Sequence, residues 1–125
     1  MNVSITSSNR EFSVREKLQV TSLNKSEVLD RLVEEDSSFI FTPAAYAELF
    51  VENENAKADG DKEYTTYVFI DTAGNMYRSG SKTLYEEFRR IFDIMDGSGE
   101  EYQIEVVKRP SNNRPGKYFM TCSII

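Results

Sequence analysis

The sequence predicts a small, mainly β fold that forms a single domain over residues 1–125. Several short segments have alternating or β-branched character and are separated by turn residues. The second half, residues 64–125, follows the order strand, turn, strand, amphipathic helix, strand, basic loop, strand. A chain of this length can also bury about two-thirds of its unfolded surface, which is enough for a core without disulfides or metals.

The first predicted strand covers residues 12–22. It is favoured by Leu18 and Val20, which alternate with polar residues and would share one face. A short helix is predicted from residue 26 to about Glu35, because valines and leucines recur there at helical spacing after a serine that can cap the helix. The N-terminal part is therefore expected to combine one strand with one short helix.

The second predicted strand covers residues 39–52. Pro43 lacks a backbone donor, so this strand is expected at a sheet edge or with a bulge. Residues 44–49 are equally compatible with one helical turn, and the pattern leaves both alternatives open. Residues 53–63 are polar and rich in turn formers, which indicates a flexible hairpin tip rather than a domain linker.

The third predicted strand is a hairpin over residues 64–79. Residues 65–71 are β-branched and aromatic, and residues 72–75 (TAGN) suit the positive φ of a tight turn. Ser81 can cap the helix that follows. Apolar residues of this helix recur at positions i, i+4, i+7 and i+8, and charged residues occupy the other side. They are Leu84, Phe88, Ile91 and Phe92, with Met95 extending the stripe.

Two further strands are predicted on either side of a loop at residues 110–115. The five strands are thus 12–22, 39–52, 64–79, 102–109 and 117–125. A helix between the third and fourth strands of a five-stranded barrel is the plan of the OB-fold. We therefore predict an OB-fold-like five-stranded barrel with one helix between the third and fourth strands and a short N-terminal helix.

Composition disfavours several classes of function. The chain contains no histidine, which removes histidine-based triads, most zinc sites and the usual general base. Its single cysteine, Cys122, is expected to be a buried thiol in a strand. No apolar run is long enough to span a bilayer and the N-terminus is polar, so we expect a cytoplasmic protein.

Acidic residues do not form a recognisable catalytic or metal site. Asp71 is best explained as the first residue of a turn. Residues 53–61 are acidic, but they lack the spacing of an EF-hand calcium loop. The loop at 111–116 lacks the features of a phosphate-binding P-loop. We therefore predict no cofactor, no metal and no enzymatic activity.

The formal net charge of −6 is unevenly distributed. Residues 1–63 hold seven Lys/Arg and thirteen Asp/Glu, whereas residues 64–125 hold eight of each. Residues 108–117 contain four cations and no acid. Because physiological salt screens charges beyond about 8 Å, a local basic patch can act on a phosphate despite a distant acidic surface. Residues 108–117 are therefore a candidate phosphate-binding segment.

Aromatic and cationic residues interleave along the chain, as the binding of single-stranded nucleic acid requires. Aromatic rings stack on bases, and cations neutralise phosphates and release counterions. The aromatic candidates are Tyr46, Phe50, Tyr64, Tyr67, Phe69, Tyr77, Tyr102 and Tyr118. The cationic candidates are Arg78, Lys82, Lys108, Arg109, Arg114 and Lys117.

The strand at residues 65–71 can be oriented in two ways. Tyr67 and Phe69 share one face, and Val68 and Ile70 share the other. We favour Val68 and Ile70 as the core pair, because they would pack well against the apolar residues of the strand at 102–109. Tyr67 and Phe69 would then face the ligand.

Several segments together resemble a known family. Residues 68–82 (VFIDTAGNMYRSGSK) combine a strand, an Asp/Gly turn, an aromatic and the serine-containing start of a helix. Residues 92–95 (FDIM) end that helix, residues 104–109 (IEVVKR) follow as a strand, and a basic loop leads to residues 117–125. With residues 12–23, this pattern resembles the single-stranded DNA-binding proteins of small tailed phages that replicate linear genomes by protein priming, and of related phages of Gram-positive hosts.

The resemblance covers roughly 80 of the 125 residues and leaves out residues 43–63. It implies that the protein coats single strands displaced during DNA replication and protects them from nucleases. It also implies single-stranded DNA as the partner, possible contacts with replication proteins, cooperative binding or self-association, and the host cytoplasm as the location.

A protein-interaction module is the main alternative. The thirteen acids of residues 1–63 are compatible with an inhibitor of a host factor that uses its acidic surface as a nucleic-acid mimic. A stoichiometric complex with one host protein, without DNA binding, would favour this alternative. The choice between DNA and RNA stays open, because it depends on contacts to the 2′-hydroxyl.

Overall fold

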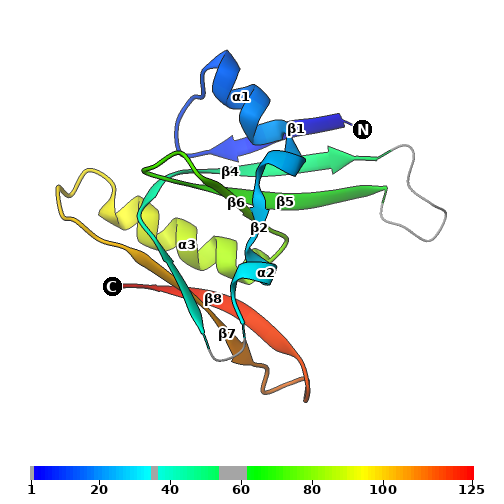
Figure 1. Cartoon of the computed structure of the whole chain (residues 1–125), viewed down its shortest axis with the longest axis vertical. Helices are drawn as coiled ribbons and strands as arrows, with labels where there is room; N and C mark the ends of the chain where they lie inside the picture. Colours follow the sequence, from blue (N-terminus) through cyan, green and yellow to red (C-terminus); the bar gives the residue numbers. More distant parts are fainter. Residues whose placement is uncertain (1, 35–36, 54–61) are drawn as a thin grey trace.

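The computed structural model of the chain describes residues 2–34, 37–53 and 62–125 (Figure 1). The fold is mainly β, as predicted, with eight strands in two sheets and three α-helices among these residues. The hairpin tip predicted over residues 53–63 lies largely outside them. No helix in the described ranges is long and apolar enough to cross a membrane.

The larger sheet has five strands in the order β1-β4-β5-β6-β2. They are β1 (Asn2–Ser8), β2 (Glu27–Val28), β4 (Pro43–Glu52), β5 (Glu63–Asp71) and β6 (Met76–Ser79). Pairing from β1 through β6 is antiparallel, whereas β2 pairs parallel with β6. The predicted hairpin of residues 64–79 is confirmed as β5–β6, and Gly74 adopts a φ of 88° in its turn.

The smaller sheet has three antiparallel strands in the order β3-β7-β8. They are β3 (Ser38–Phe41), β7 (Ile104–Pro110) and β8 (Tyr118–Ile124), so the two strands predicted in the C-terminal part are confirmed. Only Thr42 separates β3 from β4, and the chain passes directly from one sheet into the other. The predicted strand 39–52 is therefore divided between the sheets, and the register shift between Pro43 and Ala45 confirms the predicted bulge.

The strand predicted over residues 12–22 is wrong, because this segment forms helix α1 (Val14–Thr21). Ser13 caps the helix: its hydroxyl accepts a hydrogen bond from the Glu16 backbone N–H, and the Glu16 carboxylate accepts one from the Ser13 N–H. This reciprocal capping box satisfies two backbone donors at the helix start. Residues 2–8, for which no strand was predicted, form β1 instead.

The predicted N-terminal helix is shorter than expected. The chain after α1 forms a 3₁₀ turn, η1 (Leu23–Lys25), then β2, and then the four-residue helix α2 (Leu29–Leu32). Leu29 is buried in the main core, and so is Val33 just after the helix. The valine and leucine spacing thus marks core contacts correctly, but part of the segment pairs with β6 as a strand.

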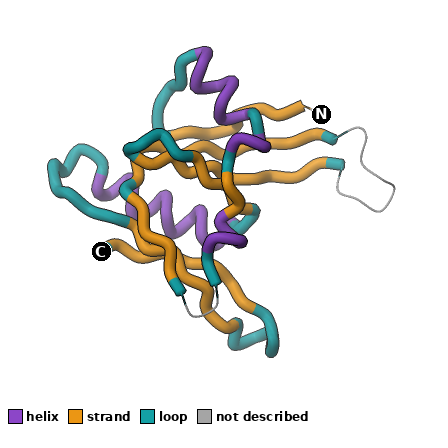
Figure 2. Tube along the Cα trace, in the orientation of Figure 1, coloured by secondary structure: helices purple, strands orange, loops and turns teal. Residues whose placement is uncertain are grey.

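Helix α3 (Lys82–Met95) confirms the predicted amphipathic helix. The Ser81 hydroxyl accepts a hydrogen bond from the Leu84 N–H and caps it, as predicted. The helix lies between the two sheets (Figure 2), and its apolar residues form the main core with residues from both. The buried residues of the helix are Leu84, Tyr85, Phe88, Ile91 and Phe92.

Both faces of β5 are buried, which overturns the prediction that one face meets ligand. Tyr67 and Phe69 face α3 in the main core. Val68 lies in a second core beneath the N-terminal elements, which includes Phe12 and Val20. Because α3 covers one face and the segment around α1 covers the other, residues 66–69 of β5 offer no open face for a base.

The described residues do not form the closed barrel that was predicted. Closure would require the outer edge of β6 to meet the smaller sheet, and β2 occupies that edge instead. The helix predicted between the third and fourth strands is nevertheless found between β6 and β7. The two sheets are joined by the β3–β4 segment and by the core around α3.

Candidate nucleic-acid interface

The end of the β7–β8 hairpin is rich in cations: residues 108–117 contain four of them and no acid. Pairing continues to Pro110 opposite Tyr118, and the Ser111 N–H then donates to the Lys117 carbonyl at 2.9 Å. The Lys117 N–H donates to the Arg114 carbonyl at 3.0 Å, and Gly116 adopts a φ of 80°. Backbone hydrogen bonds therefore define the loop, and the basic residues project from a structured hairpin. We call residues 108–119 the basic hairpin.

Three cations of the basic hairpin are exposed to solvent. They are Arg109, Arg114 and Lys117, and none of them forms an ion pair with a described residue. No acidic residue occurs between residue 106 and the end of the chain. These positive charges are therefore available to an anion approaching the hairpin.

Lys108, the fourth cation, connects the hairpin to the larger sheet. Its Nζ donates to the Asp30 carbonyl of α2 at 2.9 Å. The Asp30 carboxylate in turn accepts a hydrogen bond from the Ser79 hydroxyl of β6 at 3.0 Å. Lys108 therefore fixes the hairpin against α2 and β6, and it is less available to a phosphate than the other three cations.

Two adjacent aromatic rings are exposed at the same end of β8. Tyr118 is 46% exposed and Phe119 is 41% exposed. Adjacent residues of a strand point to opposite faces, so each face of the hairpin carries one ring. Phe119 lies opposite Arg109 in the register, and Tyr118 lies opposite Pro110. The ring of Phe119 thus shares a face with a cation that no described acid neutralises.

Phe119 was missed among the sequence candidates. The alternating pattern of residues 117–125 already places it on the face opposite Met120 and Cys122. These two side chains are buried, so Phe119 faces away from the core. Recognising Met120 and Cys122 as the core pair of the last strand would have identified Phe119 from the sequence.

Four of the aromatic candidates are wrong, because they are core residues. Tyr46, Tyr67, Phe69 and Tyr77 are all buried. The ring of Tyr67 stacks on Tyr85 at a centroid distance of 4.1 Å. Helix α3 and the smaller sheet cover the face on which these rings lie, so no base can stack on them in this arrangement.

Two of these buried tyrosines have hydroxyls that are already engaged. The Tyr46 hydroxyl donates to the Asp93 carboxylate at 2.9 Å, and the Tyr77 hydroxyl donates to the Asp71 carboxylate at 2.8 Å. Burial, assisted by these carboxylates, raises the pKa of each tyrosine to about 12. Both hydroxyls therefore serve structural hydrogen bonds at neutral pH.

Phe50 and Tyr64 lie near the end of the β4–β5 hairpin where the connecting loop begins, and both are half-buried. Phe50 is opposite Thr65, and Tyr64 is opposite Val51, so the two rings point to opposite faces. The Asn53 N–H donates to the Lys62 carbonyl at 2.6 Å and continues the pairing beyond the strands. Tyr102, the remaining aromatic candidate, is half-buried and packs against the main core.

Arg78 and Lys82 lie apart from the basic hairpin. Arg78 is half-buried on β6 opposite Val68, and its Nε is buried without a hydrogen-bond partner among the described residues. Lys82 begins α3, where its Nζ lies 3.8 Å from the Glu86 carboxylate.

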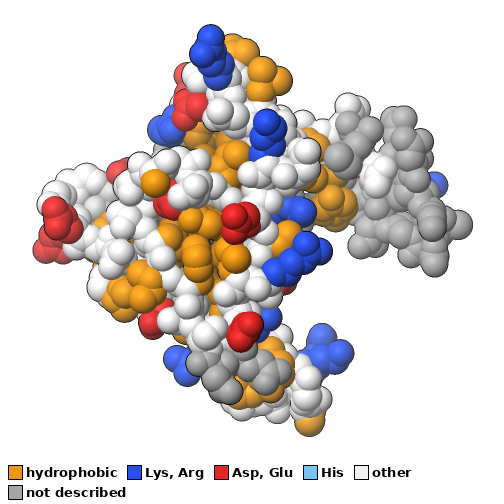
Figure 3. Space-filling view, viewed as in Figure 1, with side chains coloured by type: hydrophobic (Ala, Val, Ile, Leu, Met, Phe, Trp, Pro, Cys, Tyr) orange, Lys and Arg blue, Asp and Glu red, His pale blue; other side chains and the backbone are white. Residues whose placement is uncertain are grey.

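Arg31 on α2 is exposed and was not among the candidates. In Figure 3, Lys and Arg side chains follow the right-hand edge of the molecule from the level of α1 to the basic hairpin.

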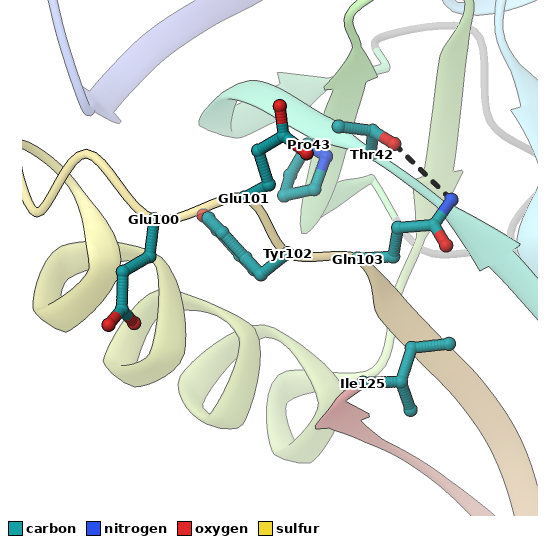
Figure 4. A pocket seen from close by; sticks show the side chains of 7 residues that line it. All are labelled: Thr42, Pro43, Glu100, Glu101, Tyr102, Gln103 and Ile125. Atoms are coloured by element: carbon teal, nitrogen blue, oxygen red, sulfur yellow. Dashed lines mark hydrogen bonds between the residues drawn. The ribbon is translucent and has the colours of Figure 1, made fainter.

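The cavity at the other end of β7 has the wrong charge for nucleic acid. It measures about 630 Å³, and Thr42, Glu100, Glu101, Tyr102 and Gln103 are among the residues that line it. Gln103 donates to the Thr42 hydroxyl at 3.4 Å, and the two glutamates point in different directions (Figure 4). The seven residues of β7 separate it from the hairpin loop by about 20 Å.

Cys122 is buried in the main core, as predicted. Burial raises the pKa of its thiol to about 12, so the thiolate is scarce at neutral pH. Among the described residues, no cluster of three or more His, Cys, Asp or Glu is arranged to hold a metal ion.

Comparisons with protein-family models, with curated proteins and with solved structures found no match for this chain.

Proposed function

We propose that this protein binds single-stranded DNA without sequence preference, and that it coats and protects displaced strands during DNA replication. The observation that carries the proposal is the basic hairpin, where two exposed rings lie beside three exposed cations in a stretch, residues 106–125, that contains no acid. As the resemblance to phage proteins implies, we place this role in phage replication in the host cytoplasm, and we propose a binding role rather than a catalytic one.

Rings and cations bind a single strand through different parts of it. A base stacked on an aromatic side chain contributes about 1–3 kcal/mol, and any base has a suitable face. Lys and Arg neutralise phosphates and release counterions, which is also independent of sequence. Phe119 and Arg109 lie opposite each other in the register, so one nucleotide can use the ring and the guanidinium together.

The order of the elements supports an OB-like interpretation in which the barrel is open. The segment β3–β4 corresponds to the first strand, followed by β5, β6, α3, β7 and β8. OB-folds bind oligonucleotides with the loops that follow their first and fourth strands. The corresponding hairpins are β4–β5, whose strands extend to the right in Figure 1, and β7–β8, which extends toward the bottom. We propose that the DNA strand runs between Phe50 or Tyr64 and the basic hairpin.

Single strands should be preferred over duplex. Paired bases are stacked on each other and cannot stack on Tyr118 or Phe119 without being opened. The chain as a whole carries a net charge of −6, which repels the dense charge of a duplex. Only the local positive charge of the basic hairpin then attracts phosphate.

Fluorescence anisotropy of a labelled oligo(dT) provides the test, with duplex DNA and RNA of the same length for comparison. The label belongs on the DNA because the protein contains no tryptophan. We expect Arg109→Glu with Lys117→Glu to abolish binding or weaken it at least tenfold. Arg15→Glu with Lys17→Glu makes the same change in net charge on α1, at the other end of the molecule (Figure 1), and should have little effect.

Two results would contradict the proposal. The first is that the wild-type protein does not bind oligo(dT) even at low salt. The second is that the variants of the hairpin and of α1 weaken binding equally, because net charge rather than a local interface would then govern the affinity.

A further inference from the structure

Strand β1 is an open edge of the larger sheet. It lies at the end of the order β1-β4-β5-β6-β2, and its outer side pairs with no described strand. Such an edge presents backbone N–H and C=O groups that can pair with another chain. Natural proteins usually protect long edges with charged residues or prolines, and residues 2–9 contain neither. The register against β4 shifts between Ile5 and Ser7, which leaves residues 2–5 as the regular part of this edge.

An apolar groove lies beside the edge. Val3 and Ile5 of β1 and Val14 and Leu18 of α1 line a cavity of about 420 Å³, to which Lys17 and Thr21 also contribute. Val14 is 74% exposed and Leu18 is 65% exposed, although both are large apolar side chains. The capping box of Ser13 and Glu16 fixes the start of α1, and Arg10 pairs with Glu16 at 2.5 Å. The two apolar side chains are therefore held outward by a well-defined helix.

We propose that this edge is the contact between two copies of the chain, which pair antiparallel through β1 and bury Val14 and Leu18 of both. In a two-fold interface the same patch of both copies is in contact, so this patch must be self-complementary. Two copies with a net charge of −6 repel each other, but residues 2–23 hold three cations and two acids, and β1 holds none. Electrostatic repulsion between two copies is therefore expected to be weak at this edge.

The other sheet edges are less suitable for a second copy. Strand β8 is as long as β1, but Lys117 directly precedes it, so antiparallel self-pairing would place one cation of each copy at an end of the contact. Strand β2 has two residues, one of which is Glu27. Strand β3 has four residues and continues almost directly into β4. Only β1 combines length, lack of charge and an adjacent apolar groove.

The location of β1 leaves the nucleic-acid interface open. Figure 1 places β1 and α1 at one end of the molecule and the basic hairpin at the other. In the dimer, the two hairpins would lie far from the contact, so one long strand could occupy both sites and gain avidity. This consequence depends on the proposed function, whereas the pairing of two copies does not.

Sedimentation equilibrium of the full chain over a range of concentrations tests the proposal directly. We expect the mean mass to rise from 14.4 kDa toward twice that value as the concentration increases. Leu18→Glu should weaken the association at least tenfold, because a two-fold interface contains the substitution twice. Ile94→Glu is the control: Ile94 on α3 is also 65% exposed but lies away from β1, so its substitution should change nothing.

Hydrogen exchange examines the strand pairing itself. The amides of residues 2–8 should exchange more slowly at high protein concentration in the wild type, and circular dichroism should confirm that Leu18→Glu folds. A wild-type protein that stays monomeric up to the highest concentration overturns the proposal. So does equal weakening by Leu18→Glu and Ile94→Glu, or an exchange rate in β1 that does not depend on concentration.

Discussion

Phe119 combines an exposed aromatic ring with a neighbouring cation. Its ring is 41% exposed and lies opposite Arg109 on a face that the core does not use. Phe119→Ala should weaken binding of oligo(dT) by about 1–3 kcal/mol, the contribution of one stacked base. The stability of the protein should change little, because Phe119 belongs to neither hydrophobic core. Anisotropy titration and urea unfolding measure the two quantities.

Ile124 is the matched control for Phe119. It lies on the same strand and is 44% exposed, but it has no aromatic ring and is at the other end of β8. Ile124→Ala should leave the affinity unchanged. If both alanine variants weaken binding alike, hydrophobic exposure rather than stacking explains the effect.

Asp71 makes the β5–β6 turn sensitive to acid. Its carboxylate accepts hydrogen bonds from the Ala73 and Asn75 N–H groups, at 3.0 and 2.8 Å, and from the Tyr77 hydroxyl. Burial raises the pKa of the carboxyl, but the hydrogen bonds lower it more, so the pKa is below its ordinary value of 3.8. The ionised form therefore stabilises the fold at neutral pH, and this contribution is lost as the pH falls below that ordinary value.

Asp71→Asn should therefore lower the free energy of unfolding by about 1–3 kcal/mol at neutral pH. The difference from wild type should shrink on acidification, because the wild-type carboxyl is then protonated as well. Urea unfolding of both proteins at neutral and acidic pH measures this difference. A difference that does not depend on pH would show that the charge of Asp71 has no role in the turn.

At the scale of the elements, the helices and strands that were predicted correctly are those whose own sequence contains a signal for them. The hairpin β5–β6, helix α3 and strands β7 and β8 have local signals, namely turn residues, an amphipathic stripe and alternation. Helix α1 also has a local signal, the Ser13-x-x-Glu16 capping box, which the strand prediction from the alternation of Leu18 and Val20 did not include. Strand β1 contains mostly serine, threonine and asparagine, and its local signal is limited to the alternation of Val3 and Ile5 with polar residues; its pairing with β4 completes it as a strand.

The interface was predictable in part for the same reason. The cations of the basic hairpin are close in sequence, so they lie close together in space whatever fold the rest of the chain adopts. Whether Tyr67 and Phe69 are buried or exposed does not follow from the residues around them in the sequence. Both faces of β5 are apolar in sequence, and which face is covered depends on where α3 and α1 pack. Periodicity alone carries no information on that choice.

Helix α3 depends on its N-cap as well as on its apolar stripe. The Ser81 hydroxyl accepts from the Leu84 N–H at 3.2 Å and satisfies one otherwise unpaired donor. Ser81→Ala should lower the free energy of unfolding by about 1 kcal/mol. The helix packs between both sheets, so the loss should appear in global unfolding by urea rather than as local fraying.

Thr83→Ala is the control for the cap. Thr83 is exposed in the first turn of the same helix, and alanine has the higher helix propensity. This variant should be as stable as wild type or slightly more stable. A loss of stability in Thr83→Ala equal to that in Ser81→Ala would mean that the capping hydrogen bond is not the cause.

For the whole molecule, the separation of charge is the property that connects fold and function. The chain is acidic overall, yet residues 106–125 contain four cations and no acid, and folding concentrates them at one end. Binding should therefore depend on salt through the few phosphates that these cations contact rather than through net charge. The logarithm of the affinity should fall linearly with the logarithm of the salt concentration, by about 0.7 for each phosphate neutralised on a single strand.

Arg114→Ala with Lys117→Ala should make this slope shallower by about 1.4, if each side chain neutralises one phosphate. Arg15→Ala with Lys17→Ala removes the same charge from α1 and should leave the slope unchanged, although it makes the protein equally more acidic. Anisotropy titrations with oligo(dT) at a series of salt concentrations give both slopes. A slope that is unchanged in the hairpin variant would place the phosphate contacts elsewhere, and equal changes in the two variants would attribute the salt dependence to the overall charge of the chain.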